Sequence, residues 1–183
     1  MTRKGLLAFV LLLLLVPICG ARPANTSNLS GLSFNSFFSP GTVLQDLNGD
    51  GITDWVNLRI IVPENASVAE IGAASELSAR LGYETTAMEL SLISTPGADP
   101  SSVTQPVVLI GRSNKWVSFL AEQKKLLLPT LAPGQGAAII VHSAFGANDA
   151  LVLIGADDAG TIAIAKAVAS RFPYAGAIGG AKF

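Results

Sequence analysis

The chain has 183 residues and carries 12 lysines and arginines against 13 aspartates and glutamates, which gives a formal net charge of −1 at pH 7. This composition offers no basic face for nucleic acid, and we exclude nucleic-acid partners on that ground. The length is that of one domain with a substantial core.

The first residues have the order of a secretory signal peptide. Arg3 and Lys4 give a basic start, residues 5–16 form an unbroken apolar run, and Pro17, Cys19, Gly20 and Ala21 end it with small and helix-breaking residues. We therefore predict a signal peptide over residues 1–21, with cleavage after Ala21 or, as a second choice, after Ala24. The mature protein is expected in a secreted, periplasmic or cell-surface location.

The same segment bears on membrane attachment. The apolar run is shorter than the roughly 20 residues that a membrane-spanning helix needs, and no later segment is long enough, so we predict no permanent membrane span.

Cys19, the single cysteine, has two interpretations: a lipid-modified thiol, against which the bulky Ile18 argues, or removal with the signal peptide. Removal leaves ten basic and thirteen acidic residues, a net charge of −3, and no cysteine for a disulfide.

The next part of the chain predicts a leader, a strand and a helix. Residues 22–45 are rich in Asn, Ser, Gly and Pro with interleaved phenylalanines and are expected to form an extended, partly ordered leader. Residues 55–62 alternate and are β-branched, which is typical of a strand. Ser67 and Glu70 have the spacing of a capping box, and Gly82 stands where a left-handed C-cap belongs. The apolar face expected of this helix comprises Val68, Ile71, Ala74, Leu77 and Leu81.

The remaining elements alternate between short apolar strands and helices. Two strand pairs lack an intervening helix, and fully apolar strands indicate a sheet covered on both faces. We therefore predict a single α/β domain over residues 58–183, with a mixed sheet and helices on both faces. The strands are expected over residues 87–93, 107–110, 137–142 and 151–154, and the helices over residues 113–123 and 158–172, the last capped by Asp158 and stopped by Pro173.

Before the first predicted strand, oxygen-bearing side chains recur at the spacing of a calcium loop. Asp46, Asn48, Asp50 and Asp54 occupy positions one, three, five and nine, and the main-chain carbonyl of Ile52 occupies position seven. Calcium is a hard cation that takes about six to eight oxygen ligands. We therefore predict that these five residues bind calcium as a structural ion.

The loop, residues 46–57, departs from a helix–loop–helix calcium hand. Position twelve is Asn57 rather than a bidentate glutamate, and a strand follows rather than a helix. With Gly51 at the sharp turn, residues 46–54 resemble the calcium loops of FG-GAP-type β-propeller repeats and dockerin-like modules of secreted proteins. The alternative is an acidic Asn-Gly/Asp-Gly turn that binds no ion.

Three segments also carry a resemblance at the level of the domain. They are Ala-Ala-Ser-Glu-Leu at residues 73–77, Val-Val-Leu-Ile-Gly-Arg at residues 107–112, and Leu-Val-Leu-Ile-Gly at residues 151–155, which leads through Gly160 into a helix. Together they resemble the small α/β domain that precedes the catalytic barrel in β-hexosaminidases, α-glucuronidases and related glycosidases, over about residues 58–172. In that family the domain is an accessory without catalytic residues.

This resemblance implies a secreted, non-catalytic module that is accessory to carbohydrate-processing or cell-surface machinery. Its candidate partners are carbohydrate or a partner catalytic domain. Since the chain does not include the barrel that follows this domain in the family, the alternative is the N-terminal fragment of a secreted glycoside hydrolase.

The residues themselves supply no recognisable catalytic set. His142, the only histidine, is followed by Ser143, but adjacent strand residues point to opposite faces and are not expected to pair as base and nucleophile. One histidine and no mature cysteine give poor support for zinc ligation or thiol catalysis. Glu84 and Glu89, on either side of a strand start, are the weakest candidate, as a glycosidase carboxylate pair.

Two polar turns at strand ends are further candidate sites. Residues 111–115 follow a strand at the usual ligand-facing rim of an α/β sheet, and a plain helix cap is the other interpretation. Residues 155–160 open a helix after a strand but lack Gly-x-Gly-x-x-Gly spacing and carry two carboxylates, so we predict a tight turn with an aspartate N-cap. We assign no catalytic or cofactor-binding residue.

Overall fold

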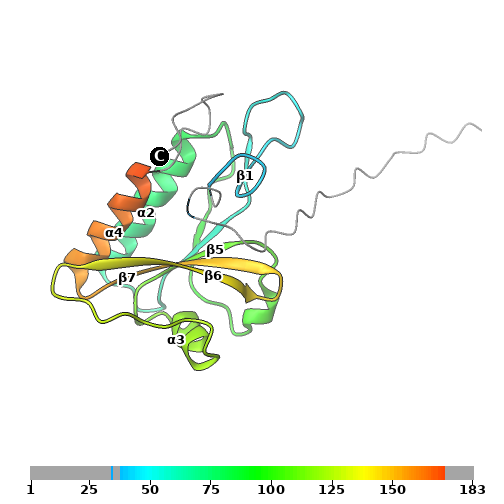
Figure 1. The fold of residues 1–183 in the computed structure, drawn as a ribbon. Helices are drawn as coiled ribbons and strands as arrows, with labels where there is room; N and C mark the ends of the chain where they lie inside the picture. The colour runs from blue at the N-terminus through cyan, green and yellow to red at the C-terminus, as the bar shows by residue number, and fades with distance from the viewer. Residues whose placement is uncertain (1–33, 35–37, 172–183) are drawn as a thin grey trace, which may run out of the picture.

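The computed structural model describes residue 34 and residues 38–171. They form one α/β domain in which a five-stranded sheet is flanked by helices (Figure 1). The predicted signal peptide, residues 1–21, lies outside the described residues, as do both predicted cleavage points. None of the helices that the structure describes combines the length and the apolar character that a bilayer span requires.

The five-stranded sheet is mixed, as the sequence predicts. Its order is β4 (Ile93–Ser94), β3 (Arg59–Ile61), β5 (Val107–Ile110), β7 (Asn148–Gly155) and β6 (Gly136–Phe145). β3 pairs in parallel with β4 and β5, and β5 pairs in parallel with β7. β6 and β7 form an antiparallel hairpin.

Successive residues of the central strands face opposite sides of the sheet. Val108 of β5 belongs to the core beneath α2 (Val68–Tyr83) and α4 (Asp158–Arg171), whereas Leu109 belongs to the core beneath α3 (Lys115–Glu122). Alternation of side chains along a strand produces this division. Figure 1 shows α2 and α4 side by side on one face and α3 on the other, so the predicted helices cover both faces.

Helix α2 begins as predicted and ends later. The Ser67 hydroxyl accepts the backbone N–H of Glu70, and the Glu70 carboxylate accepts that of Ser67, which confirms the capping box. The predicted C-cap at Gly82 is wrong, because the helix continues past it and Glu84 is the C-cap. Gly82 instead leaves room for Leu90, whose Cδ1 would lie 2.9 Å from a Cβ at that position.

The buried face of α2 is rotated from the predicted one. Val68 and Ile71 are 89% and 50% exposed, so their assignment to the apolar face is wrong. The small residues Ala73 and Ala74 lie in one core with Ala165 of α4, and small side chains let two helices approach closely. The residues that α2 buries are Ala69, Glu70, Ala73, Ala74, Leu77 and Leu81.

The predicted strand over residues 55–62 is divided between two sheets. Its first part, β2 (Trp55–Val56), pairs antiparallel with β1 (Leu44–Gln45), and its second part is β3 in the main sheet. The chain changes partner at the buried Leu58, since Asn57 N donates to the Val43 carbonyl and Arg59 N donates to the Pro106 carbonyl.

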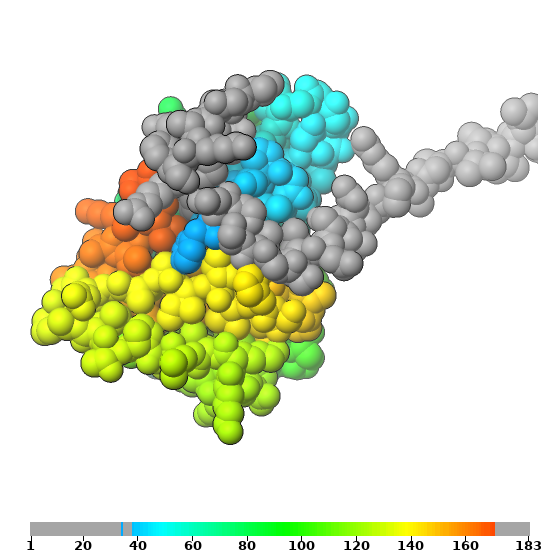
Figure 2. Space-filling model, viewed as in Figure 1, coloured from blue at the N-terminus to red at the C-terminus, as the bar shows by residue number. Residues whose placement is uncertain are grey.

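The hairpin of β1 and β2 is anchored in the core. Phe38, Val43 and Leu44, from the predicted leader, are buried with the residues of α2 and α4, whereas Phe34 is 46% exposed. Figure 2 shows the hairpin, in blue and cyan, at one extremity of the molecule. The loop over residues 46–54 is therefore the tip of a hairpin whose base is packed against the domain.

Candidate functional site

The predicted calcium loop connects β1 and β2. Two of its glycines, Gly49 and Gly51, have φ values of +79° and +86°, a backbone conformation that favours glycine. Asp46 Oδ1 accepts the N–H of Gly49 at 2.6 Å, and Asp46 Oδ2 accepts that of Gly51 at 2.8 Å. These bonds favour the charged carboxylate and hold the pKa of Asp46 below its ordinary value. The bond from Gly51 has the largest effect, followed by the bond from Gly49.

The other predicted ligands also curl the loop. Asn48 Oδ1 accepts the N–H of Asp50 at 2.9 Å, and Asp50 Oδ1 accepts that of Ile52 at 2.8 Å. At the base of the loop, Asp54 Oδ1 accepts the N–H of Leu47 at 2.8 Å. Each predicted side-chain ligand therefore has an oxygen that accepts a backbone or side-chain N–H within the same turn.

The donor set suits calcium in its chemistry. The four side chains at positions 46, 48, 50 and 54 and the Ile52 carbonyl offer only hard oxygens, and each oxygen that accepts one N–H has a second lone pair. The part of the chain that the structure describes nevertheless contains no group of three or more His, Cys, Asp or Glu side chains gathered as around a metal ion. In this conformation the carboxylates are directed at N–H groups of the loop.

The far side of the loop is fixed to the segment that precedes β4. The Thr53 carbonyl accepts bonds from both the backbone N–H and the hydroxyl of Thr86, at 2.9 and 3.2 Å. Asp54 N donates to the Gln45 carbonyl at 2.9 Å, which closes the hairpin. Hydrogen bonds thus join the loop to Gln45 of β1 and to Thr86 of the segment before β4.

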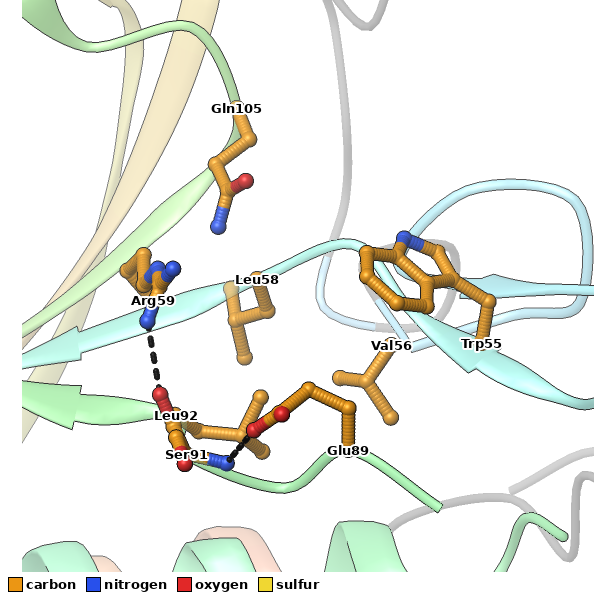
Figure 3. A pocket seen from close by; sticks show the side chains of 8 residues that line it. All are labelled: Trp55, Val56, Leu58, Arg59, Glu89, Ser91, Leu92 and Gln105. Carbon is orange, nitrogen blue, oxygen red and sulfur yellow. Dashed lines mark hydrogen bonds between the residues drawn. The ribbon is translucent and has the colours of Figure 1, made fainter. Parts of the chain in front are cut away.

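A pocket of about 330 Å³ opens beside the base of the hairpin (Figure 3). Its floor is apolar and buried, and consists of Val56, Leu58 and Leu92. Its rim carries an aromatic side chain and polar groups from three separate segments, namely Trp55, Arg59, Glu89, Ser91 and Gln105. Nothing in the sequence analysis singled out this combination, because its members lie up to 50 positions apart.

Two hydrogen bonds organise one wall of this pocket. Arg59 Nη1 donates to the Ser91 carbonyl at 2.6 Å, and the backbone N–H of Ser91 donates to Glu89 Oε1 at 2.8 Å. The pKa of Glu89 is lowered, first by the Ser91 hydroxyl, then by the Ser91 backbone N–H, and also by the positive charge of Arg59. Glu89 is therefore held as a carboxylate beside a guanidinium.

The residues that follow the carboxyl end of β5 have structural roles. Asn114 is the N-cap of α3, with Oδ1 accepting the N–H of Trp116 at 3.0 Å, and its buried Nδ2 donates to the carbonyls of Ile61 and Ile110. A smaller cavity of about 190 Å³ lies there, but its charged groups Lys115 and Glu64 bind each other. The helix-cap interpretation of residues 111–115 is confirmed for Asn114.

The turn over residues 155–160 is tight, as predicted, but its capping residue differs. Asp157 rather than Asp158 accepts the N–H of Gly160, at 2.8 Å, and its other carboxylate oxygen accepts that of Gly134. A Cβ at Gly160 would lie 2.1 Å from the Gln135 carbonyl oxygen. The glycine therefore serves the close approach of two backbone segments, and the prediction of Asp158 as the cap is wrong.

The candidate catalytic residues do not form a catalytic set among the described residues. His142 Nδ1 lies 3.0 Å from Oδ2 of the buried Asp149, whose Oδ1 accepts the backbone N–H of Ser143 at 2.8 Å. Histidine and serine are thus held by one carboxylate, and no hydrogen bond joins their side chains among the described residues. Glu84 pairs with Arg80 at the end of α2, whereas Glu89 belongs to the pocket beside the hairpin.

Comparison of the chain with protein-family models finds no match, and comparison with curated proteins also finds none.

Proposed function

We propose that this protein is a secreted, non-catalytic α/β module that binds calcium in the loop over residues 46–54 and is accessory to carbohydrate-processing or cell-surface machinery. The single observation that carries the proposal is the composition of the hairpin tip. Five oxygen donors at calcium-loop spacing lie in one turn that two left-handed glycines shape and that hydrogen bonds tie to the domain.

Calcium would act there as a structural ion. Three carboxylates in one short loop, those of Asp46, Asp50 and Asp54, repel each other, and a divalent cation removes that repulsion. Binding would require the side chains to exchange part of their N–H contacts for the ion, with the Ile52 carbonyl as a further ligand. Because the loop connects β1 and β2, the bound ion would fix the hairpin against the core.

The direct test is calorimetric titration of the mature chain, from residue 22 onward, with calcium chloride. Asp50→Asn retains an oxygen that can accept the N–H of Ile52 but removes one negative charge, so the affinity should fall about tenfold or more. Asp99→Ala removes an exposed carboxylate outside the loop and is the matched control with unchanged affinity. Absence of calcium binding by the unaltered chain would remove the proposal's basis.

The non-catalytic character has its own test. His142 carries the one imidazole in the chain, and Asp149, which lies 3.0 Å from it, also accepts the backbone N–H of Ser143. We expect the mature protein to release no product from aryl glycosides or aryl esters. Turnover above background that disappears in His142→Ala would show that the His142–Asp149 pair acts as a catalytic base.

A further inference from the structure

The pocket beside the hairpin has the lining of a ligand site. Its volume of about 330 Å³ is within the range of about 300–1,000 Å³ that is typical of small-molecule pockets. The floor of Val56, Leu58 and Leu92 is apolar, and the rim is polar and aromatic (Figure 3). An apolar surface with a few polar groups around it is the usual construction of a small-molecule site.

The polar groups of the rim retain hydrogen-bonding capacity. The indole N–H of Trp55 and the side-chain amide of Gln105 have no hydrogen-bond partner among the residues that the structure describes. Arg59 uses one of its five N–H donors on the Ser91 carbonyl, and Glu89 has a second carboxylate oxygen. The pocket therefore offers both donors and acceptors to a ligand.

Trp55 supplies the stacking surface. Its side chain is 37% exposed, and Figure 3 shows its ring at one side of the pocket, with Arg59 at the other and Gln105 and Glu89 above and below. A large aromatic ring that is partly exposed beside polar groups suits a ligand with an apolar face and a hydrophilic edge. A sugar ring has this chemistry, since its C–H groups form a face and its hydroxyls, which both donate and accept, form the edge.

The charges of the rim favour a neutral sugar. Arg59 and Glu89 contribute one charge of each sign. The two rim charges sum to zero, and the hydroxyls of a neutral sugar can bind a guanidinium, a carboxylate and an amide together.

We infer that the pocket binds a neutral sugar ring, stacked on Trp55 and hydrogen-bonded through its hydroxyls to Arg59, Glu89 and Gln105. The inference deepens the proposed function by naming a ligand class and its site. Two parts of the pocket lining are connected to the hairpin loop. Trp55 directly follows Asp54, and the segment leading to Glu89 is hydrogen-bonded through Thr86 to the Thr53 carbonyl. Calcium in the loop should therefore strengthen sugar binding.

The test uses the mature chain on an array of immobilised neutral and acidic oligosaccharides, followed by titration with soluble forms of the neutral glycans that bind. The unaltered protein should bind neutral glycans. Trp55→Ala and Gln105→Ala should each weaken binding about tenfold or more, because one removes the stacking surface and the other removes an available amide. Circular dichroism verifies that each variant is folded. If Trp55→Ala does not fold, Gln105→Ala still tests the inference.

Tyr83→Ala is the matched control. Tyr83 is an exposed aromatic residue, 78% accessible at the end of α2, and does not line the pocket. Its removal should leave glycan binding unchanged. Absence of binding to all neutral glycans, binding to acidic glycans alone, or equal binding by Trp55→Ala and the unaltered chain would overturn the inference.

The same titrations in calcium and in chelator separate this inference from the proposed function. Sugar binding that weakens in chelator would support both. Calcium binding without any sugar binding would overturn only the inference of a sugar site. Sugar binding without any calcium binding would overturn only the proposal of a calcium site in the loop.

Discussion

At the scale of single residues, Gly111 has the clearest geometric role. It follows β5 with φ at +87°, and a Cβ there would lie 1.9 Å from Glu70 Oε1 and 3.2 Å from Pro63 Cγ. Glu70 is half of the capping box of α2, so this glycine permits a helix cap to sit against the end of a strand. Both its backbone conformation and its missing side chain are required.

Gly111→Ala should therefore destabilise the protein by more than the roughly 1–2 kcal/mol that a left-handed backbone costs a non-glycine residue. The extra loss, about 1 kcal/mol, reflects displacement of the Glu70 carboxylate from the Ser67 N–H. Gly134→Ala is the matched control, with φ at +77° and nothing within 4 Å of the added Cβ. Urea denaturation of the two variants measures the difference, and equal losses would contradict the steric argument.

The Asp46 carboxylate predicts an effect of pH. Hydrogen bonds from Gly51 and Gly49 lower its pKa in the folded protein below the ordinary value of 3.8. A lowered folded-state pKa contributes stability that is present above the unfolded-state value and is lost as the pH falls through the folded-state value. The contribution of Asp46 should thus be complete at neutral pH, begin to fall below about pH 4 and be lost progressively as the pH falls through the lowered folded-state pKa.

Thermal melting of the unaltered chain and of Asp46→Asn, both in chelator, measures this contribution. The unaltered chain should melt at the higher temperature at neutral pH, and the gap should narrow as the pH falls below 3.8. Other carboxylates titrate in both proteins and cancel in the comparison. A gap that is the same at every pH would show that the Asp46 charge does not contribute through these bonds.

Several residue roles were predictable because they depend on local spacing. The capping box at Ser67 and Glu70 needs only residues three apart, and the structure confirms it. The cap of α4 was assigned to Asp158 instead of Asp157, since two adjacent aspartates satisfy the pattern equally and only the geometry selects one. The pocket residues Trp55 and Gln105 come from distant segments, and no local pattern joins them.

At the scale of elements, α3 depends on one buried side chain. Asn114 is fully buried, caps the helix through the N–H of Trp116, and donates to carbonyls of β3 and β5. Asn114→Ala should cost about 2–4 kcal/mol, because it removes the cap and leaves buried carbonyls with fewer donors. Asp99→Ala removes the exposed cap of a short 3-10 turn, Pro100–Ser102, and should cost less than about 1 kcal/mol in the same urea experiment. Equal costs would contradict this role of Asn114.

The strands were predictable in proportion to their burial. β5 is apolar on both faces and matches its predicted bounds, 107–110. The predicted bounds of the strand over residues 87–93 are wrong, since residues 87–92 are irregular and β4, at the edge of the sheet, comprises only Ile93–Ser94. The break at Leu58 was not predictable, since alternation continues through it while the hydrogen-bond partners change from β1 to the main sheet.

At the scale of the whole molecule, the fold class followed from the order of apolar strands and helices, whereas the sheet order did not. Strand order β4-β3-β5-β7-β6 places β5 beside both β3 and β7 through contacts distant in sequence. The burial of Val43 and Leu44 in the core was also not predictable, because composition alone assigns residues 22–45 to a leader. The calcium and sugar sites stay predictions that depend on this hairpin.

Export is a prediction about the whole chain and rests on the basic, apolar and small-residue order of residues 1–21. Mass spectrometry of material released by the native host should show a mature N-terminus at Arg22 or Asn25. Recovery of the intact chain from the cytosol, still beginning at Met1, would contradict export.

The central claim is that calcium in the loop over residues 46–54 stabilises the hairpin and, through it, the domain. A ligand that binds only the native state at about a hundred times its dissociation constant adds about 2.7 kcal/mol. For a domain of this size the melting temperature should rise by roughly 5–10 °C. Asp50→Asn should lose about half of this rise or more, as a tenfold or greater loss of affinity requires, whereas Asp157→Ala, which removes the cap of α4, should melt lower but keep it.

The most direct measurement is therefore thermal melting of the mature chain and these two variants, each in excess calcium and in chelator. Calcium should raise the melting temperature of the unaltered chain and of Asp157→Ala by the same amount, and that of Asp50→Asn by about half as much or less. A melting temperature of the unaltered chain that is indifferent to calcium would reduce the segment to an acidic turn and contradict the account.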